Sequence, residues 1–315
     1  MRPATWHDLR ADASRVRSYA RRLHDLRAEV PVPPPLPEGR IVDIPGRGET
    51  LVREMAGPPG APTILLLHGW TLSADLNWFT FYDAIGRHGR VLAMDIRGHG
   101  RGIRSEQRFS LDGAADDAAA LLSHLDAGPA VVVGYSMGGS VALLMWRHHP
   151  ETVSGLVLQS TALQWRSSLR DRLLWSSMSV VEYALRLGVP RGLTERYLRQ
   201  AIEDSPGLGR YRGWVKGEMR RPDPTDIAAA GRALSAFDAR SFAGEIDVPT
   251  AVVVSCRDRL VSPQRQLELA GAIPGAVAME LDIGHDGWLV RPAELAAAID
   301  TALASVIGRR GITVL

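Results

Sequence analysis

Three side chains in this sequence, those of Ser136, Asp258 and His285, are of the types that together make a serine reactive. A serine hydroxyl is a weak nucleophile at neutral pH, so it needs a base such as histidine within hydrogen-bond reach and an acid that orients the base. Ser136 lies in GYSMGG, with the spacing G-x-S-x-G, whose glycines suit a tight turn. The predicted chemistry is attack of Ser136 on an acyl carbonyl carbon, with His285 as base and Asp258 as orienting acid.

Each of these residues closely follows an apolar run typical of a buried strand. The runs are 130–134 before Ser136, 250–255 before Asp258 and 276–282 before His285. Parallel strands bring their carboxyl ends to one edge of a sheet, where functional side chains of such folds gather. We therefore expect the three side chains to meet there.

Other residues compete for two of the roles. Asp282 and Asp286 are alternative acids, but they stand so close in sequence to the histidine that we expect them to point elsewhere. His68 and His99 are alternative bases. The histidine pair at 148–149 ends the helix that begins at the serine. At 1.5 Å per residue the pair lies about 18 Å from the serine, which is too far for either histidine to act as the base.

The segments around these residues alternate between strand and helix. Strand-like runs lie at 41–44, 50–56, 63–67, 90–95, 130–134, 154–160, 250–255 and 276–282, and helical patterns near 76–88, 111–127, 137–149, 264–272 and 292–307. This alternation predicts a doubly wound α/β domain with a parallel sheet. The alternation stops at 162–240, where we find only helical patterns, so we expect a core at 41–161 and 241–315 that is interrupted by a helical insertion.

A developing oxyanion needs preorganised N–H donors. One candidate is the backbone N–H of Met137, which follows the serine at the start of a helix. The loop after the strand at 63–67 offers a second, and Trp70 in the segment HGW is the expected donor. His68 in the same segment is expected to be structural, with a ring that ties the loop together by hydrogen bonds.

Five motifs resemble those of the α/β-hydrolase superfamily, in its capped, esterase- and lipase-like members. They are HGW at 68–70, DIRGHGRG at 95–102, GYSMGG at 134–139, CRDRLV at 256–261 and GHDGW at 284–288. The resemblance implies an eight-stranded, mostly parallel sheet, a helical cap at 162–240, and a triad in the chain order serine, aspartate, histidine. It also implies an architectural role for Arg97 and His99. A serine at the turn argues against epoxide hydrolases and dehalogenases, which carry aspartate there.

The insertion should decide which substrate binds. Trp175 and Met178 belong to an apolar group that could line an acyl pocket, and the alternative that this group forms the insertion's own core is about equally favoured. The substrate class would be small-molecule acyl esters. Acyl transfer or perhydrolysis on the same triad, and a ligand-binding module without catalysis, stay open as alternatives.

The composition limits which other partners and cofactors we expect. The net charge of +2 gives no case for nucleic acid, and one cysteine, Cys256, makes a thiolate metal site improbable. We expect no metal and no cofactor, because the base and the oxyanion donors already supply the chemistry. No run suits a membrane span or a secretory signal, so we expect a cytoplasmic protein. The segment 1–40 combines a basic amphipathic helix with a proline-rich linker at 31–37, and packing on the core or peripheral contact with a membrane would both suit that helix.

Overall fold

A single eight-stranded sheet organises the computed structural model, which describes residues 32–166 and 211–309. The strand order is β1-β2-β4-β3-β5-β6-β7-β8, and all pairings from β4 to β8 are parallel, while β1 and β2 pair antiparallel at one edge. The strands are β1 Glu38–Ile44, β2 Gly48–Met55, β3 Thr63–Leu67, β4 Arg90–Met94, β5 Ala130–Tyr135, β6 Val153–Gln159, β7 Thr250–Ser255 and β8 Val277–Leu281. The predicted α/β class and its doubly wound, mostly parallel, eight-stranded sheet are confirmed.

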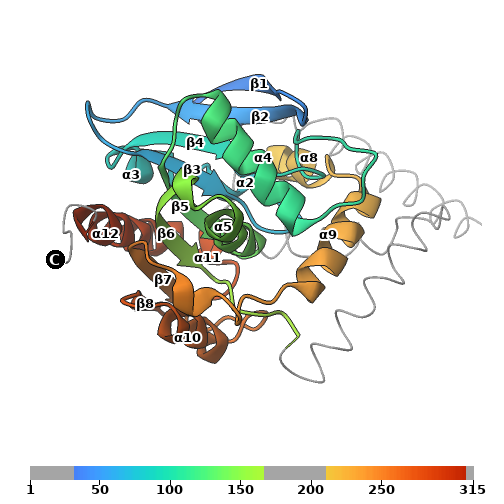
Figure 1. The fold of residues 1–315 in the computed structure, drawn as a ribbon. Helices are drawn as coiled ribbons and strands as arrows, with labels where there is room; N and C mark the ends of the chain where they lie inside the picture. The colour runs from blue at the N-terminus through green and yellow to red at the C-terminus, as the bar shows by residue number, and fades with distance from the viewer. Residues whose placement is uncertain (1–31, 167–210, 310–315) are drawn as a thin grey trace, which may run out of the picture.

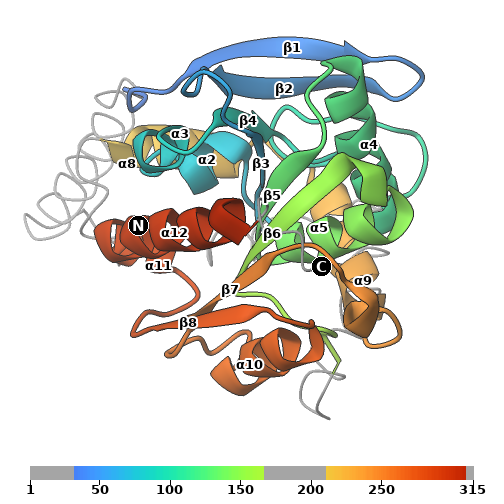
Figure 2. The ribbon, with the colours of Figure 1, turned by 60° about the vertical axis from the view of Figure 1, so that its left-hand side comes forward.

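Helices cover both faces of the sheet. Those of the described residues are α2 Ala74–Trp78, α3 Tyr82–Gly86, α4 Leu111–His124, α5 Met137–His148, α8 Arg212–Met219, α9 Pro224–Ala236, α10 Pro263–Ala272, α11 Gly287–Val290 and α12 Pro292–Arg309. Helices α4, α5 and α10 contribute to one buried apolar cluster, and α2, α3 and α12 to the other, on the opposite face (Figure 2). The central strands are buried on both sides, which explains their uninterrupted apolar runs.

The prediction of one continuous helix across 76–88 is wrong. The chain forms two short helices there, α2 and α3, with a break at Phe79–Phe81. Aromatic and β-branched residues are weak helix formers, and here the rings of Phe79 and Phe81 pack against different neighbours. The ring of Phe79 packs edge-on against Trp214 of α8 at 5.4 Å, while Phe81 packs against Trp78 at 6.1 Å. Tertiary contacts therefore override the helical pattern.

The segment between β6 and β7, here called the insertion, contains α8 and α9 among its described residues, on the right-hand side of Figure 1. Trp175 and Met178 lie outside the described residues, as does the amphipathic pattern before residue 32. The domain boundaries proposed from the sequence stay predictions. Within 32–166 and 211–309, no helix has the length and apolar character needed to cross a bilayer.

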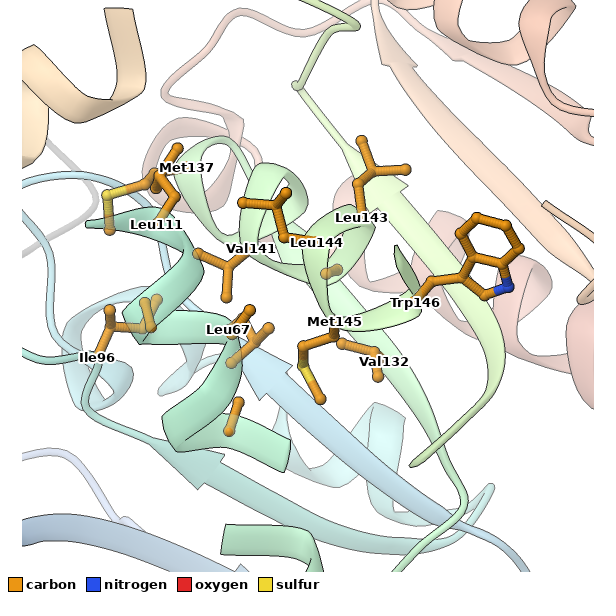
Figure 3. Packing of buried hydrophobic residues seen from close by; sticks show 14 of the residues in the cluster. Leu67, Ile96, Leu111, Val132, Met137, Val141, Leu143, Leu144, Met145 and Trp146 are labelled. Atoms are coloured by element: carbon orange, nitrogen blue, oxygen red, sulfur yellow. The ribbon is translucent and has the colours of Figure 1, made fainter. Parts of the chain in front are cut away.

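Helix α5 carries the packing that fixes the position of Ser136. Its apolar face meets the sheet through Val141 and Met145, which lie near Leu67 of β3 and Val132 of β5 (Figure 3). All four side chains are fully buried. A helix held so firmly gives the residue at its amino end a fixed position at the carboxyl edge of the sheet.

Candidate active site

Ser136 occupies a strained turn between β5 and α5. Its backbone has φ 53° and ψ −115°, a conformation that costs a residue with a Cβ on the order of 1–3 kcal/mol. The N–H of Ser136 donates to the carbonyl oxygen of Gln159 at 2.8 Å, which ties the turn to the end of β6. The turn thus places the hydroxyl at the carboxyl edge of the sheet, where the loops after β7 and β8 also arrive.

The structure brings Ser136, His285 and Asp258 together. Nε2 of His285 lies 3.1 Å from Oγ of Ser136, and Nδ1 lies 2.7 Å from Oδ2 of Asp258. With its Nδ1 proton donated to the carboxylate, the imidazole presents Nε2 as the acceptor for the serine hydroxyl. The arrangement can therefore move a proton from the hydroxyl to the ring while the carboxylate stabilises the charge.

Asp258 is buried and fixed by its own turn. Its Oδ1 accepts backbone N–H groups from Leu260 and Val261, both at 2.8 Å, and Nε2 of Gln266 lies 3.3 Å from Oδ2. The side chain is fully shielded from solvent. These donors satisfy a buried carboxylate and hold it toward the imidazole.

The alternative acids Asp282 and Asp286 make other contacts within the described residues. The carboxylate of Asp282 is exposed and pairs with the guanidinium of Arg257. Asp286 precedes α11 at its N-cap position. Of these carboxylates, the one with a hydrogen bond to His285 is that of Asp258.

His68 ties the loop after β3 to the loop after β4. Its Nε2 accepts the N–H of Ile96 at 2.9 Å, so Nδ1 carries the proton and donates to the carbonyl oxygen of Gly69, also at 2.9 Å. Complete burial, together with His99 nearby, lowers the pKa of His68 to about 3. A neutral, fully engaged ring confirms the expected structural role.

Arg97 and His99 also have structural roles, since both stabilise the loop after β4. Arg97 makes two hydrogen bonds to the carboxylate of Asp117 on α4, at 2.5 and 2.7 Å, and both groups are buried. Nδ1 of His99 lies 3.1 Å from the carbonyl oxygen of Arg97, and burial lowers the pKa of this histidine to about 4. At the far end of α5, His148 and His149 pair with aspartates of α4.

The expected oxyanion donors lie on segments that meet beside the serine. Met137 is fully buried and is the first residue of α5, where backbone N–H groups lack helical partners. Trp70 follows Gly69, and a Cβ built on that glycine would stand only 2.7 Å from the ring of Tyr135. The loop carrying Trp70 therefore lies directly against the residue that precedes Ser136.

Two further residues, Tyr135 and Gln266, also contribute to the site. The hydroxyl of Tyr135 donates to the carbonyl oxygen of His285, and burial raises the pKa of this tyrosine well above its ordinary value. Gln266 bonds Asp258, while its Oε1 accepts the N–H of Ser255 at 2.9 Å. Tyr135 is a variable position of the G-x-S-x-G spacing, and Gln266 lies in a helix, so no sequence motif marks either.

Known proteins share both the sequence pattern and the fold. A family model described as the α/β-hydrolase fold matches residues 62–292. The pimeloyl-[acyl-carrier protein] methyl ester esterase of Chromobacterium violaceum is 30% identical over 226 residues, which cover 70% of this chain and 85% of that protein.

A second relative matches over a shorter length. The dihydrolipoyllysine-residue acetyltransferase component of the acetoin cleaving system of Pseudomonas putida is 38% identical over 110 residues, 35% of this chain and 29% of that protein. The crystal structure of the enol-lactonase from Burkholderia xenovorans LB400 superposes with a TM-score of 0.71 at 23% identity, covering 84% of this chain and 100% of that chain, and so shares the fold. With the family model matching well over half of its length, the chain belongs to the α/β-hydrolase fold family.

Proposed function

We propose that the protein is a serine carboxylic ester hydrolase in which Ser136, His285 and Asp258 form the catalytic triad. The observation that carries this proposal is the continuous hydrogen-bonded path from Asp258 through His285 to the hydroxyl of Ser136 at the strained turn. Membership in a family whose relatives include an esterase supports the same reaction class.

The first half of the proposed reaction forms an acyl-enzyme. Oγ of Ser136 attacks the ester carbonyl carbon, and its proton passes to Nε2 of His285. The carbonyl electron pair moves to oxygen, where the backbone N–H groups of Met137 and Trp70 stabilise the charge. Collapse of this intermediate breaks the bond to the alcohol, which leaves with the proton from His285.

The second half releases the acid. Water takes the place of the alcohol, gives a proton to Nε2 of His285 and attacks the acyl carbon. Breakdown of the second tetrahedral intermediate returns the proton to Oγ of Ser136. In this scheme Asp258 keeps the imidazole in the productive tautomer and stabilises the imidazolium in both halves.

Small acyl esters are the substrate class we propose. The insertion between β6 and β7 would supply the acyl pocket, and the expectation that Trp175 and Met178 line it belongs to this proposal. Each methylene accepted by an apolar pocket contributes about 0.8 kcal/mol, so the preference should change gradually along an acyl series.

Purified protein tested against p-nitrophenyl esters of graded acyl length, and labelled with a fluorophosphonate, examines the proposal directly. We expect hydrolysis and labelling by the wild type, and a loss of turnover of about 10⁴-fold or more in Ser136→Ala. Ser123→Ala, which alters an exposed serine on α4, is the matched control and should keep full activity. A wild type that neither hydrolyses nor labels would favour a binding module, and activity that survives in Ser136→Ala would refute the assignment of the nucleophile.

A further inference from the structure

The loop from His68 to Ser73, here called the oxyanion loop, joins β3 to α2 and carries Trp70. Its first residues are held by the core: His68 bonds two backbone groups, and the N–H of Gly69 donates to Oδ1 of Asn77 at 2.9 Å. Thr71 in its middle has φ 67°, a backbone conformation that persists only where the surroundings hold it. The loop therefore depends on further contacts for its shape.

The insertion supplies two such contacts. The indole N–H of Trp70 donates to the carbonyl oxygen of Ile227, in the first turn of α9, at 2.8 Å. The hydroxyl of Ser73 donates to Oε2 of Glu218, on α8, at 3.1 Å. Helices α8 and α9, both distant in sequence from the oxyanion loop, thus hold it at two points.

Two buried carboxylates and their arginine partners attach α8 to the core. The side chain of Glu218 is 1% exposed; it bonds Arg101 at 2.9 Å and Arg221 at 2.8 Å. Arg101 also lies 3.4 Å from Asp75, whose two oxygens accept bonds from Arg53 of β2, each at 2.8 Å. These five side chains, here called the ion network, extend without interruption from the sheet to the insertion.

The position of the Ile227 carbonyl is also fixed. The N–H of Ile227 donates to the carbonyl oxygen of Asp223, which closes the first turn of α9. The next residues of α9 are buried, and Ala229 and Ala230 belong to the same apolar cluster as α4, beside which α9 lies in Figure 1. The acceptor of the indole N–H therefore belongs to a well-packed helix.

We propose that the side chain of Trp70 is a positioning group, which sets the backbone amide of the same residue for the oxyanion by bonding the insertion. The inference rests on the proposed function and deepens it, because it makes α9 part of the machinery that stabilises the transition state. An oxyanion donor acts only when it lies about 2.7–3.1 Å from the charged oxygen, so a small shift of the loop reduces its effect. The ground state of the substrate depends much less on this contact.

The test removes the indole N–H and separates transition-state stabilisation from substrate binding. In Trp70→Phe we expect kcat to fall about 10- to 100-fold while KM stays within about 2-fold. The affinity for a trifluoromethyl ketone should fall by the same factor as kcat. This reagent forms a bond between its carbonyl carbon and Oγ of Ser136, sends the serine proton to His285 and leaves an oxyanion that the loop must stabilise.

Trp146→Phe is the matched control. Its indole N–H donates to Oδ1 of Asp247 at 3.1 Å, at the far end of α5, so the variant loses a comparable bond without touching the oxyanion loop. Its kcat, KM and ketone affinity should equal those of the wild type. If Trp70→Phe does not fold, incorporation of 3-benzothienylalanine at position 70 keeps the shape of the ring system and removes the N–H alone.

Wild-type kcat and ketone affinity in Trp70→Phe would overturn the inference while the proposed function stands. A rise in KM that varies with acyl length would also overturn it, since that result marks a side chain that lines the substrate pocket. A wild-type protein without esterase activity and without fluorophosphonate labelling would overturn the proposed function itself, and this inference with it.

Discussion

The carbonyl oxygen of Leu67 lies 2.1 Å from the point that a Cβ on Gly138 would occupy. The last residue of β3 and the first turn of α5 therefore touch through their backbones, and only a glycine permits this approach. The contact sets the distance between the turn that carries Ser136 and the loop that carries Trp70.

Gly138→Ala should separate these two segments. Because the neighbouring atoms belong to the backbone, the clash cannot be relieved by a side-chain rotation, and we expect a loss of about 2 kcal/mol or more in unfolding free energy. Esterase activity should fall more than the fraction of folded protein. In Gly271→Ala, in α10, the new Cβ has no described atom within 4 Å beyond its chain neighbours and its own helix backbone, so this change should be neutral or stabilising. Urea unfolding of both variants provides the comparison, and equal stabilities would contradict this account.

Asp258→Asn should greatly lower kcat while the protein stays folded. An amide in this position turns an N–H toward Nδ1 of His285 and favours the wrong tautomer, so we expect a loss in kcat on the order of 10⁴-fold. Asp282→Asn, which alters an exposed partner of Arg257, should stay within about threefold of the wild type. If Asp282→Asn is the variant that loses activity, the acid has been assigned wrongly.

Tyr135→Phe should loosen the loop that carries His285. Its hydroxyl donates to the carbonyl oxygen of His285, and we expect a loss of about 1 kcal/mol in stability with a several-fold lower kcat. Tyr82→Phe is the matched control, because the buried hydroxyl of Tyr82 has no hydrogen-bond partner within the described part of the chain. That change should be neutral or stabilising. Thermal unfolding and ester turnover, measured together on both variants, test whether the Tyr135 hydroxyl holds the loop that carries His285.

Acid should destabilise the fold through its buried histidines. The folded pKa values of His68 and His99 are about 3 and 4, lowered by burial, whereas an unfolded histidine titrates near 6.5. Between about pH 6.5 and 4 the unfolded chain therefore binds protons that the folded protein does not, and each histidine lowers stability by about 1.4 kcal/mol per unit fall in pH. Burial raises the pKa of Asp95 to about 6, so that carboxylate contributes a slope of opposite sign over about pH 6 to 4.

His99→Leu removes one of these titrations. The slope of unfolding free energy against pH between 4.5 and 5.5, from urea titrations, should then differ from that of the wild type by about 1.4 kcal/mol per pH unit. Identical slopes in the two proteins would show that His99 is not neutral in the folded state at these pH values.

The sheet and the meeting of Ser136 with His285 and Asp258 could be anticipated because both depend on local signals. Buried parallel strands require uninterrupted apolar runs, and the carboxyl ends of such strands must meet at one edge. The break between α2 and α3 carried no such signal, since Phe79 responds to an aromatic partner on α8 far along the chain. The bond from Trp70 to Ile227 spans 157 residues, and only the packed insertion brings the two groups together.

The ion network has a consequence for behaviour at high temperature. Hydration of charged groups becomes less favourable on heating, so the desolvation that opposes buried ion pairs decreases, while stabilisation from apolar contacts levels off. The attachment of α8 to the core through Glu218 and Arg101 should therefore survive heating better than an apolar contact of similar extent. We expect the catalytic optimum to lie close to the melting temperature of the core, because the oxyanion loop should keep its shape until the sheet itself begins to unfold.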